Sequence, residues 1–253
     1  MSRFFVSPSD IDGRYIYITD KDDLHHIKKV LRLRKGDEVD ISDGETWEYR
    51  AVIEETREDE AVLAILDKQK FAREPEVKIT LYQGIPKGSK MEDIIRKSVE
   101  LGVFRIVPVF MERTVAVDKG NSRKKLERWQ KISDEAVKQC RRGIIPKVEK
   151  PVDFSRMEDE LSQYQLTIFP YENEEDKTIK DFLRENACRI KGESDKNSKT
   201  LAVIIGPEGG FSDEEASRLA ARGICGVSLG KTILRTETAG PAAIAMTMYE
   251  LEL

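Results

Sequence analysis

The stretch LAVIIGPEGGFS, residues 201–212, decides the fold of this chain. Its first six residues form a near-continuous apolar run, which is typical of a strand buried on both faces of a parallel sheet. A glycine-rich turn leads from this strand into a helix predicted from Asp213 to about Arg222, with Ser212 and Glu215 forming a capping box. A strand, a turn and a helix in this order indicate an α/β domain.

The same alternation of strands and helices continues on both sides of this stretch. Strands are predicted at 78–85, 104–110, 165–172 and 226–230. Helices are predicted at 89–101, 122–142, 178–186 and from about Pro241 to the end. A second capping box is predicted between Ser89 and Glu92, and the polar stretch 187–200 is predicted to be a loop.

The first seventy or so residues follow a different pattern. Short alternating or β-branched segments predict strands at 14–19, 37–42, 48–55 and 61–67. Between the first two strands, the spacing of Leu24, Ile27 and Leu31 predicts one short amphipathic helix. Several short strands and one helix favour a small β-barrel. The stretch 70–76 is predicted to link this barrel to the α/β region.

Charge and composition exclude several classes of protein. The chain of 253 residues has 43 Lys and Arg against 47 Asp and Glu, and its net charge of −4 excludes a histone-like polycation. No apolar run approaches the roughly 18 residues of a membrane span, and the N-terminus lacks the pattern of a signal peptide. Three distant cysteines indicate reduced thiols in a cytoplasmic protein, and two adjacent histidines argue against a metal site.

Two loops follow the last two predicted strands, GPEGGF at 206–211 and LGKTILRTETAG at 229–240. Ligands of open α/β sheets bind beyond the carboxyl ends of the strands, so both loops are candidate binding loops. The first has neither the Walker nor the GxGxxG pattern, and the alternative is a plain glycine turn. In the second, Arg235 stands among threonines and Glu237, which favours binding of an anionic group. The alternative there is a capping network at the last helix.

Basic residues gather in two places, although the chain as a whole is slightly acidic. Residues 25–35, HHIKKVLRLRK, contain no acid, and residues 120–147 contain nine Lys and Arg against three acids. Such stretches match the electrostatic footprint of a phosphate backbone. The alternative is a pair of solvated faces, which is the commoner meaning of a single charge run.

Six motifs together resemble one family, the RsmE family of bacterial 16S ribosomal RNA uridine-N3 methyltransferases in the SPOUT superfamily. The motifs are HHIKKVLR, GDEVDISDG, KGSKMEDIIRKSVELGV, RWQKISDEAVKQCRRGIIPKV, IIGPEGGFS and LGKTILRTETA. The resemblance covers nearly the whole chain in order, apart from an insert around 190–199. It implies a PUA-like β-barrel at 1–72 and a SPOUT α/β domain at 76–253 with a deep C-terminal trefoil knot.

The resemblance also implies ligands and partners. The implied cofactor is S-adenosylmethionine, and the implied partner is 16S rRNA within the 30S subunit and not DNA. The implied protein is a homodimer, and a cytoplasmic location is expected. The implied cofactor-binding residues are Pro170, Tyr171, Gly206, Pro207, Glu208, Gly209, Gly210, Leu229, Gly230, Ile233, Leu234, Arg235, Thr236, Glu237, Thr238 and Ala239. Arg235 is the catalytic candidate. Candidate RNA contacts are Arg32, Arg34, Lys87, Lys90, Arg113, Arg128, Gln139 and Arg142.

One segment departs from the pattern of the family. The family commonly has Glu-Gln-Ser-Gly-Arg where this chain has Lys138, Gln139, Cys140, Arg141 and Arg142, which adds positive charge. Two alternatives to the implied function stay open. One is a related SPOUT enzyme that acts on another rRNA or tRNA nucleotide, and the other is a non-catalytic RNA-binding assembly factor.

Overall fold

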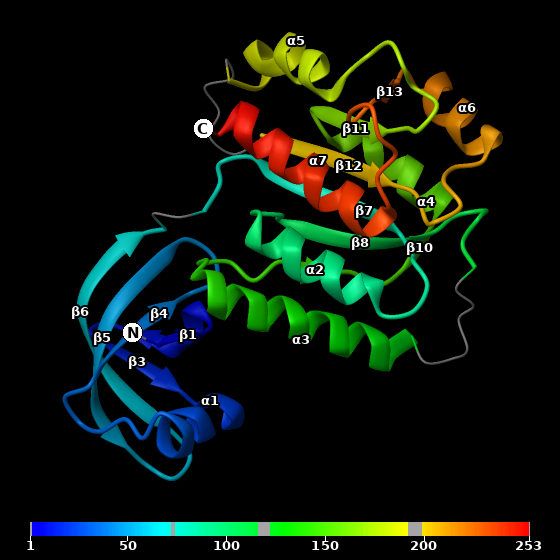
Figure 1. Cartoon of the computed structure of the whole chain (residues 1–253). Coiled ribbons are helices and arrows are strands. Elements are labelled where there is room, and N and C mark those ends of the chain that lie inside the picture. Colours follow the sequence, from blue (N-terminus) through cyan, green and yellow to red (C-terminus); the bar gives the residue numbers. More distant parts are fainter. Residues whose placement is uncertain (1, 72–73, 116–121, 192–198, 253) are drawn as a thin grey trace. The chain divides into compact units, whose positions relative to one another are not determined.

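The chain divides into two compact units (Figure 1). The structure is a computed structural model that describes residues 2–71, 74–115, 122–191 and 199–252. The first unit is Met1–Glu74 with Val137–Ile145, and the second is Pro75–Ala136 with Pro146–Leu253. The predicted domains 1–72 and 76–253 are continuous segments, whereas this division groups Val137–Ile145 with the first unit.

A six-stranded sheet forms the first unit. Its order is β1 (Arg3–Phe5), β4 (Glu38–Ser42), β5 (Trp47–Thr56), β6 (Ala61–Lys70), β3 (Tyr15–Ile18) and β2 (Ile11–Asp12). β1 pairs with β4 in parallel, and the other neighbours are antiparallel. The four predicted strands are present, whereas β1 and β2 are too short to leave a pattern. β6 runs through Lys70, so the predicted linker begins too early.

Apolar residues at alternate positions of these strands form the core of the first unit. Ile16, Val39 and Leu63, for example, have no exposed surface. The predicted helix appears as α1 (Lys21–His25) continued by a π-helical segment (His26–Val30), and it buries Leu24 and Ile27 as their spacing predicts. A short 3₁₀ helix (Pro8–Asp10) precedes β2.

A parallel sheet forms the second unit. Its order is β10 (Val152–Asp153), β8 (Arg105–Phe110), β7 (Lys78–Gly84), β12 (Thr200–Ile205), β11 (Leu166–Pro170) and β13 (Gly226–Val227), with β9 (Lys147–Val148) beside β8. The pairs are parallel throughout. β12, the apolar run of the sequence, lies between β7 and β11 and is buried along most of its length. The prediction of a central buried strand is confirmed.

The helices of the second unit are α2 (Lys90–Glu100), α3 (Ser122–Cys140), α4 (Phe154–Glu160), α5 (Ile179–Lys191), α6 (Asp213–Ala221) and α7 (Thr236–Leu251), with a 3₁₀ turn at Leu161–Gln163. The last turn of α3 groups with the first unit. α7 contacts β7 and β12 and has α2 and α5 as neighbours. No helix among the described residues is both long and apolar enough to cross a membrane.

Three local predictions need correction. The terminal helix begins at Thr236, and Pro241 lies inside it, because the backbone N–H groups of Thr238 and Ala239 already bond to the Arg235 carbonyl and start the helix earlier. α5 continues to Lys191, into the predicted loop 187–200, while 192–198 lie outside the described residues.

Only one of the two predicted capping boxes forms. The box between Ser212 and Glu215 forms in both halves at the start of α6. The box predicted at Ser89 does not form, because the Glu92 side chain pairs instead with Arg128 of α3 at 2.8 Å.

Candidate functional site

The candidate site lies at the carboxyl ends of β12, β11 and β13, where the predicted loops emerge. The loop 206–210 follows β12, Pro170 ends β11, and the segment 229–235 leads from β13 to α7. In Figure 1 this last segment is the thin orange-red trace between β13 and α7. All the residues predicted to bind the cofactor therefore belong to the second unit.

A buried hydrogen-bond relay joins the two binding loops. The Thr236 hydroxyl at the start of α7 donates to the Gly206 carbonyl oxygen at 2.7 Å. The same hydroxyl oxygen accepts a hydrogen bond of 2.9 Å from Nε2 of Gln83, which has no exposed surface and is the second-last residue of β7. This relay fixes the beginning of α7 against the first loop, so the ends of two loops that are 30 residues apart meet at one point.

Two glycines make the close packing of the first loop possible. A Cβ at Gly84 would lie 2.5 Å from the backbone nitrogen of Pro207, so the chain can pass there only without a side chain. Gly210 has a φ of +68°, and a Cβ there would lie 2.0 Å from Oε1 of Glu172. Gly84 and Gly210 are thus required by contacts with other segments, and Gly210 also by its positive φ.

A chain of charges also joins the two loops. Nζ of Lys90 lies 3.1 Å from Oε1 of Glu208 in the first loop and 3.3 Å from Oε2 of Glu237 in α7. The Glu208 carboxylate also accepts hydrogen bonds from the backbone N–H of Lys87, at 3.0 and 3.3 Å. Lys87 and Lys90, which the sequence suggests as RNA contacts, therefore meet the predicted cofactor loops.

These charges shift one another's pKa values. Hydrogen bonding to Glu208, and then to Glu237, raises the pKa of Lys90. Partial burial opposes the ionised form of Glu208, but the backbone N–H groups of Glu208 and Lys87 and the Lys90 ammonium together lower its pKa. The pKa of Glu237 is lowered first by its own backbone N–H and then by Lys90. Both carboxylates are therefore ionised at neutral pH.

Arg235 stands at the N-cap of α7 and its side chain is exposed. No hydrogen bond or ion pair of its guanidinium is formed within the described part of the chain, although its charge helps to lower the pKa of Glu237. Ile233, two residues earlier, is 82% exposed. A free guanidinium and an exposed apolar side chain on one segment suit a ligand with both charged and apolar parts.

The remaining predicted cofactor residues lie around these loops. Tyr171 stacks on Phe169 with ring centroids 5.3 Å apart, next to Pro170. Gly230 has open space where a Cβ would stand. Gly209 receives a hydrogen bond of 3.1 Å on its carbonyl oxygen from Arg113, another suggested RNA contact. Leu229 and Leu234 are half-buried, while Thr238 and Ala239 belong to the first turn of α7.

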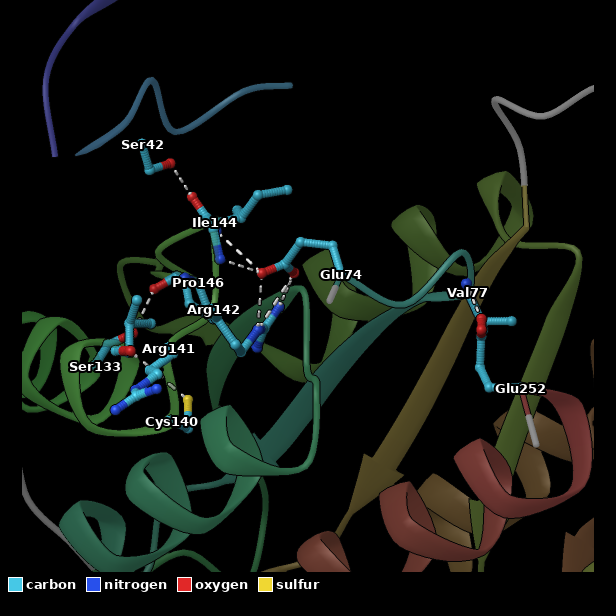
Figure 2. Close-up of polar contacts among 12 residues, drawn as sticks. Ser42, Glu74, Val77, Ser133, Cys140, Arg141, Arg142, Ile144, Pro146 and Glu252 are labelled. Atoms are coloured by element: carbon cyan, nitrogen blue, oxygen red, sulfur yellow. Dashed lines mark hydrogen bonds and ion pairs between the residues drawn. The ribbon is translucent and has the colours of Figure 1, made fainter. Parts of the chain in front are cut away.

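The suggested RNA contacts outside this cluster are of two kinds. Arg32, Arg34 and Gln139 are exposed, and Arg128 is exposed but paired with Glu92. Arg142 differs, because only 6% of its side chain is exposed and its Nη2 lies 2.8 Å from Oε2 of Glu74 (Figure 2). The basic stretch 120–147 is therefore not one exposed face, and the guanidinium of Arg142 is committed to a buried ion pair.

Sequence reasoning missed three polar residues that hold these segments. Gln83 supports Thr236, Glu172 lies against Gly210, and Glu74 binds Arg142. For Gln83 a signal exists, since it is a polar residue near the end of an otherwise largely apolar strand. Glu172 lies in an acidic stretch and Glu74 in one of mixed charge, and nothing local distinguishes either residue. Among the described residues, no cluster of His, Cys, Asp or Glu could hold a metal ion.

Comparison with known proteins agrees with this architecture. Residues 73–248 match the family model of an RNA methyltransferase domain, and residues 18–66 match that of an RNA methyltransferase PUA domain. Ribosomal RNA small subunit methyltransferase E from a Synechocystis strain is 34% identical, over 99% of this chain and 78% of that protein. The Bacillus subtilis protein of the same name is 29% identical, over 100% of this chain and 98% of its own length.

A solved structure of a protein with the same name is also similar to this chain. The crystal structure of Ribosomal RNA small subunit methyltransferase E from Neisseria gonorrhoeae, bound to S-adenosyl methionine, is 30% identical, with a TM-score of 0.80 over 98% of this chain and 97% of that one. The fold, both family models and the full-length relatives agree, and the chain belongs to the family of Ribosomal RNA small subunit methyltransferase E.

Proposed function

We propose that this protein transfers the methyl group of S-adenosylmethionine to N3 of a uridine in 16S ribosomal RNA. The methyltransferase family and the relative bound to S-adenosyl methionine support the reaction class and the cofactor, and the names of the relatives support small-subunit rRNA as the substrate. The observation that carries the proposal is the hydrogen bond between Thr236 and Gly206, which brings the two candidate cofactor loops together.

The residues of the two loops fit S-adenosylmethionine. Gly230 leaves its backbone open to a ligand, and Ile233 offers an exposed apolar side chain on which an adenine ring can pack. Oε2 of Glu237 is buried and lies 3.3 Å from Nζ of Lys90, so this carboxylate is held beside these groups by an ion pair. We propose that the cofactor is held by 206–210, by 229–239 and by Pro170 and Tyr171. When bound, it supplies an activated methyl group.

The chemistry of uracil defines what the side chains must do. N3 carries a proton and is not nucleophilic until that proton passes to solvent water, and the resulting negative charge spreads over N3, O2 and O4. The free guanidinium of Arg235 can stabilise this charge by preorganised hydrogen bonds. Holding N3 in line with the methyl group supplies a further part of the rate. The target base must be unstacked to reach the loops.

Glu237 is a poor choice for the base that accepts this proton. Its carboxylate is bound by Lys90, and its lowered pKa makes it a weak proton acceptor. We therefore assign Glu237 to the support of the loops and leave Arg235 as the catalytic residue of the proposal.

The finer architecture belongs to the same proposal. The first unit is a PUA-like β-barrel that holds RNA, with Arg32, Arg34 and Gln139 as exposed contacts. Within the second unit, the proposed RNA contacts are Lys87, Arg113 and Arg128. The loops and α7 form the deep trefoil knot of the SPOUT superfamily.

α7 is apolar around most of its circumference and leaves Met246 and Tyr249 37% and 71% exposed. Such a face supports a homodimer.

Two experiments test the function. Nucleoside mass spectrometry of 16S rRNA from a strain that lacks the gene, with and without complementation, should show loss and return of 3-methyluridine. Purified protein with labelled S-adenosylmethionine should modify 30S subunits and leave tRNA unlabelled. A modified nucleoside other than 3-methyluridine, or label in tRNA, would assign the chain to another RNA target. Absence of cofactor binding by calorimetry would favour an assembly factor.

A further inference from the structure

Lys90 occupies a position that local helix physics disfavours. It is the first residue of α2, where the positive end of the helix dipole repels a cation. Gly88, with a φ of +64°, turns the chain just before the helix, so that the Lys87 N–H and the Lys90 ammonium reach the same carboxylate of Glu208. A lysine at a helix N-terminus is unfavourable, and here the carboxylates of Glu208 and Glu237 offset its repulsion from the helix dipole. This arrangement indicates that Lys90 has a function other than helix formation.

The two carboxylates belong to the two candidate cofactor loops. Glu208 is in the loop after β12, and Glu237 is the second residue of α7. The side chains of Lys90, Glu208 and Glu237 are 36%, 28% and 20% exposed, so water screens the charges only in part. Without Lys90, two carboxylates would face each other across the site, and their repulsion would push the loops apart.

We propose that Lys90 is a positioning residue for the cofactor, which holds the 206–210 loop and the start of α7 at the separation that S-adenosylmethionine requires. The inference rests on the proposed function and changes the role of Lys90 from a contact with RNA to a support of the cofactor loops. It complements the buried relay through Thr236, because the two links bind the same pair of segments through different side chains.

The test compares Lys90→Met with Lys90→Arg and with Lys97→Met. Methionine keeps the length of the side chain and removes the charge, arginine keeps the charge, and Lys97 is an exposed lysine of α2 that serves as the matched control. Calorimetry should show S-adenosylmethionine binding weakened by about threefold to tenfold in Lys90→Met. Lys90→Arg should recover most of the affinity, and Lys97→Met should bind like the wild type.

Kinetic measurements distinguish a positioning role of Lys90 from a role as an RNA contact. In Lys90→Met, KM for S-adenosylmethionine should rise more than kcat falls, while RNA affinity and its dependence on salt should stay as in the wild type. Unchanged cofactor affinity with a smaller salt slope for RNA would overturn the inference and make Lys90 an RNA contact. If Lys90→Met does not fold, Glu208→Gln replaces it, and normal cofactor binding by that variant would equally overturn the inference.

Different results would contradict the proposed function and the inference about Lys90. A wild-type protein that neither binds S-adenosylmethionine nor methylates RNA would remove the proposed function. A wild-type protein that does both, beside a Lys90→Met variant with unchanged cofactor affinity, would remove only the inference about Lys90.

Discussion

The Glu74 carboxylate binds the Arg142 guanidinium at 2.8 Å, and both side chains are almost fully buried (Figure 2). The same carboxylate accepts hydrogen bonds from the backbone N–H of Gly143, at 2.6 Å, and of Ile144, at 3.1 Å. The Gly143 carbonyl oxygen in turn accepts a hydrogen bond from Ser42 at the end of β4. These contacts explain why the segment Val137–Ile145, which is far beyond the sheet in sequence, groups with the first unit.

Removal of one partner of this buried pair should destabilise the first unit strongly. Arg142→Met leaves the Glu74 charge buried without its guanidinium, which costs about 3–5 kcal/mol in comparable pairs. Arg128→Met is the control, because that arginine is 67% exposed and its pair with Glu92 is worth about 0–1 kcal/mol. Urea unfolding measures both, and equal small losses would contradict a structural role for Arg142.

The Thr236 hydroxyl should matter for both stability and cofactor binding. Thr236→Val keeps the shape but leaves Nε2 of Gln83 and the Gly206 carbonyl oxygen without this partner, at a cost of about 1–3 kcal/mol. Thr236→Ser retains the hydroxyl and is the matched control. Urea unfolding and calorimetry with S-adenosylmethionine measure the two effects. If the valine variant bound S-adenosylmethionine like the wild type, the hydrogen bonds of Thr236 would have no role in cofactor binding.

Gly210 should be more sensitive to substitution than a glycine with similar backbone elsewhere. Gly210 and Gly223 have φ of +68° and +77°, but a Cβ meets Glu172 at the first and nothing within 4 Å at the second. Both alanine variants carry the strain of positive φ, about 1–3 kcal/mol. Gly210→Ala should in addition weaken S-adenosylmethionine binding, measured by calorimetry, whereas Gly223→Ala should not. Equal affinities in the two variants would contradict a role for the loop in cofactor binding.

Arg235 should affect the methyl-transfer step far more than stability. Its side chain is exposed, so Arg235→Ala should change the free energy of unfolding by no more than about 0.5 kcal/mol. Loss of a preorganised donor to the developing charge should lower kcat by about 10²–10³. Labelled methyl transfer to 30S subunits gives kcat, and Arg96→Ala, at another exposed arginine, is the control. Near wild-type turnover by Arg235→Ala would remove Arg235 from catalysis.

Acid should weaken the links made by Glu208 and Glu237. Because their folded pKa values are lowered, their contribution to stability is complete above the unfolded pKa of about 4.3 and is lost as pH falls through the folded values. Wild type should therefore lose more unfolding free energy between neutral pH and pH of about 3 than the double variant Glu208→Gln, Glu237→Gln. Urea titrations at several pH values measure the difference. Parallel curves would show that the pairs with Lys90 add nothing to stability.

Local sequence patterns predict the longer strands and helices and the two candidate loops, but not β1, β2, β9, β10 or α4. The apolar run 201–206 predicts the buried strand, Ser212 with Glu215 predicts the cap of α6, and the position of both loops after strands predicts a site at one edge of the sheet. These features are local, because hydrophobic period, caps and turns act within a few residues. Patterns of this kind are visible without any knowledge of neighbours in space.

The tertiary structure alone decided which side chains meet. Nothing local distinguishes Lys90 as the partner of Glu208 and Glu237, or Arg142 as a buried arginine among exposed ones, because each depends on segments distant in sequence. The unformed cap at Ser89 has the same origin, because Glu92 pairs with Arg128 of α3. A charged side chain pairs with the opposite charge that folding brings within a few ångströms, and only the packed chain fixes that distance.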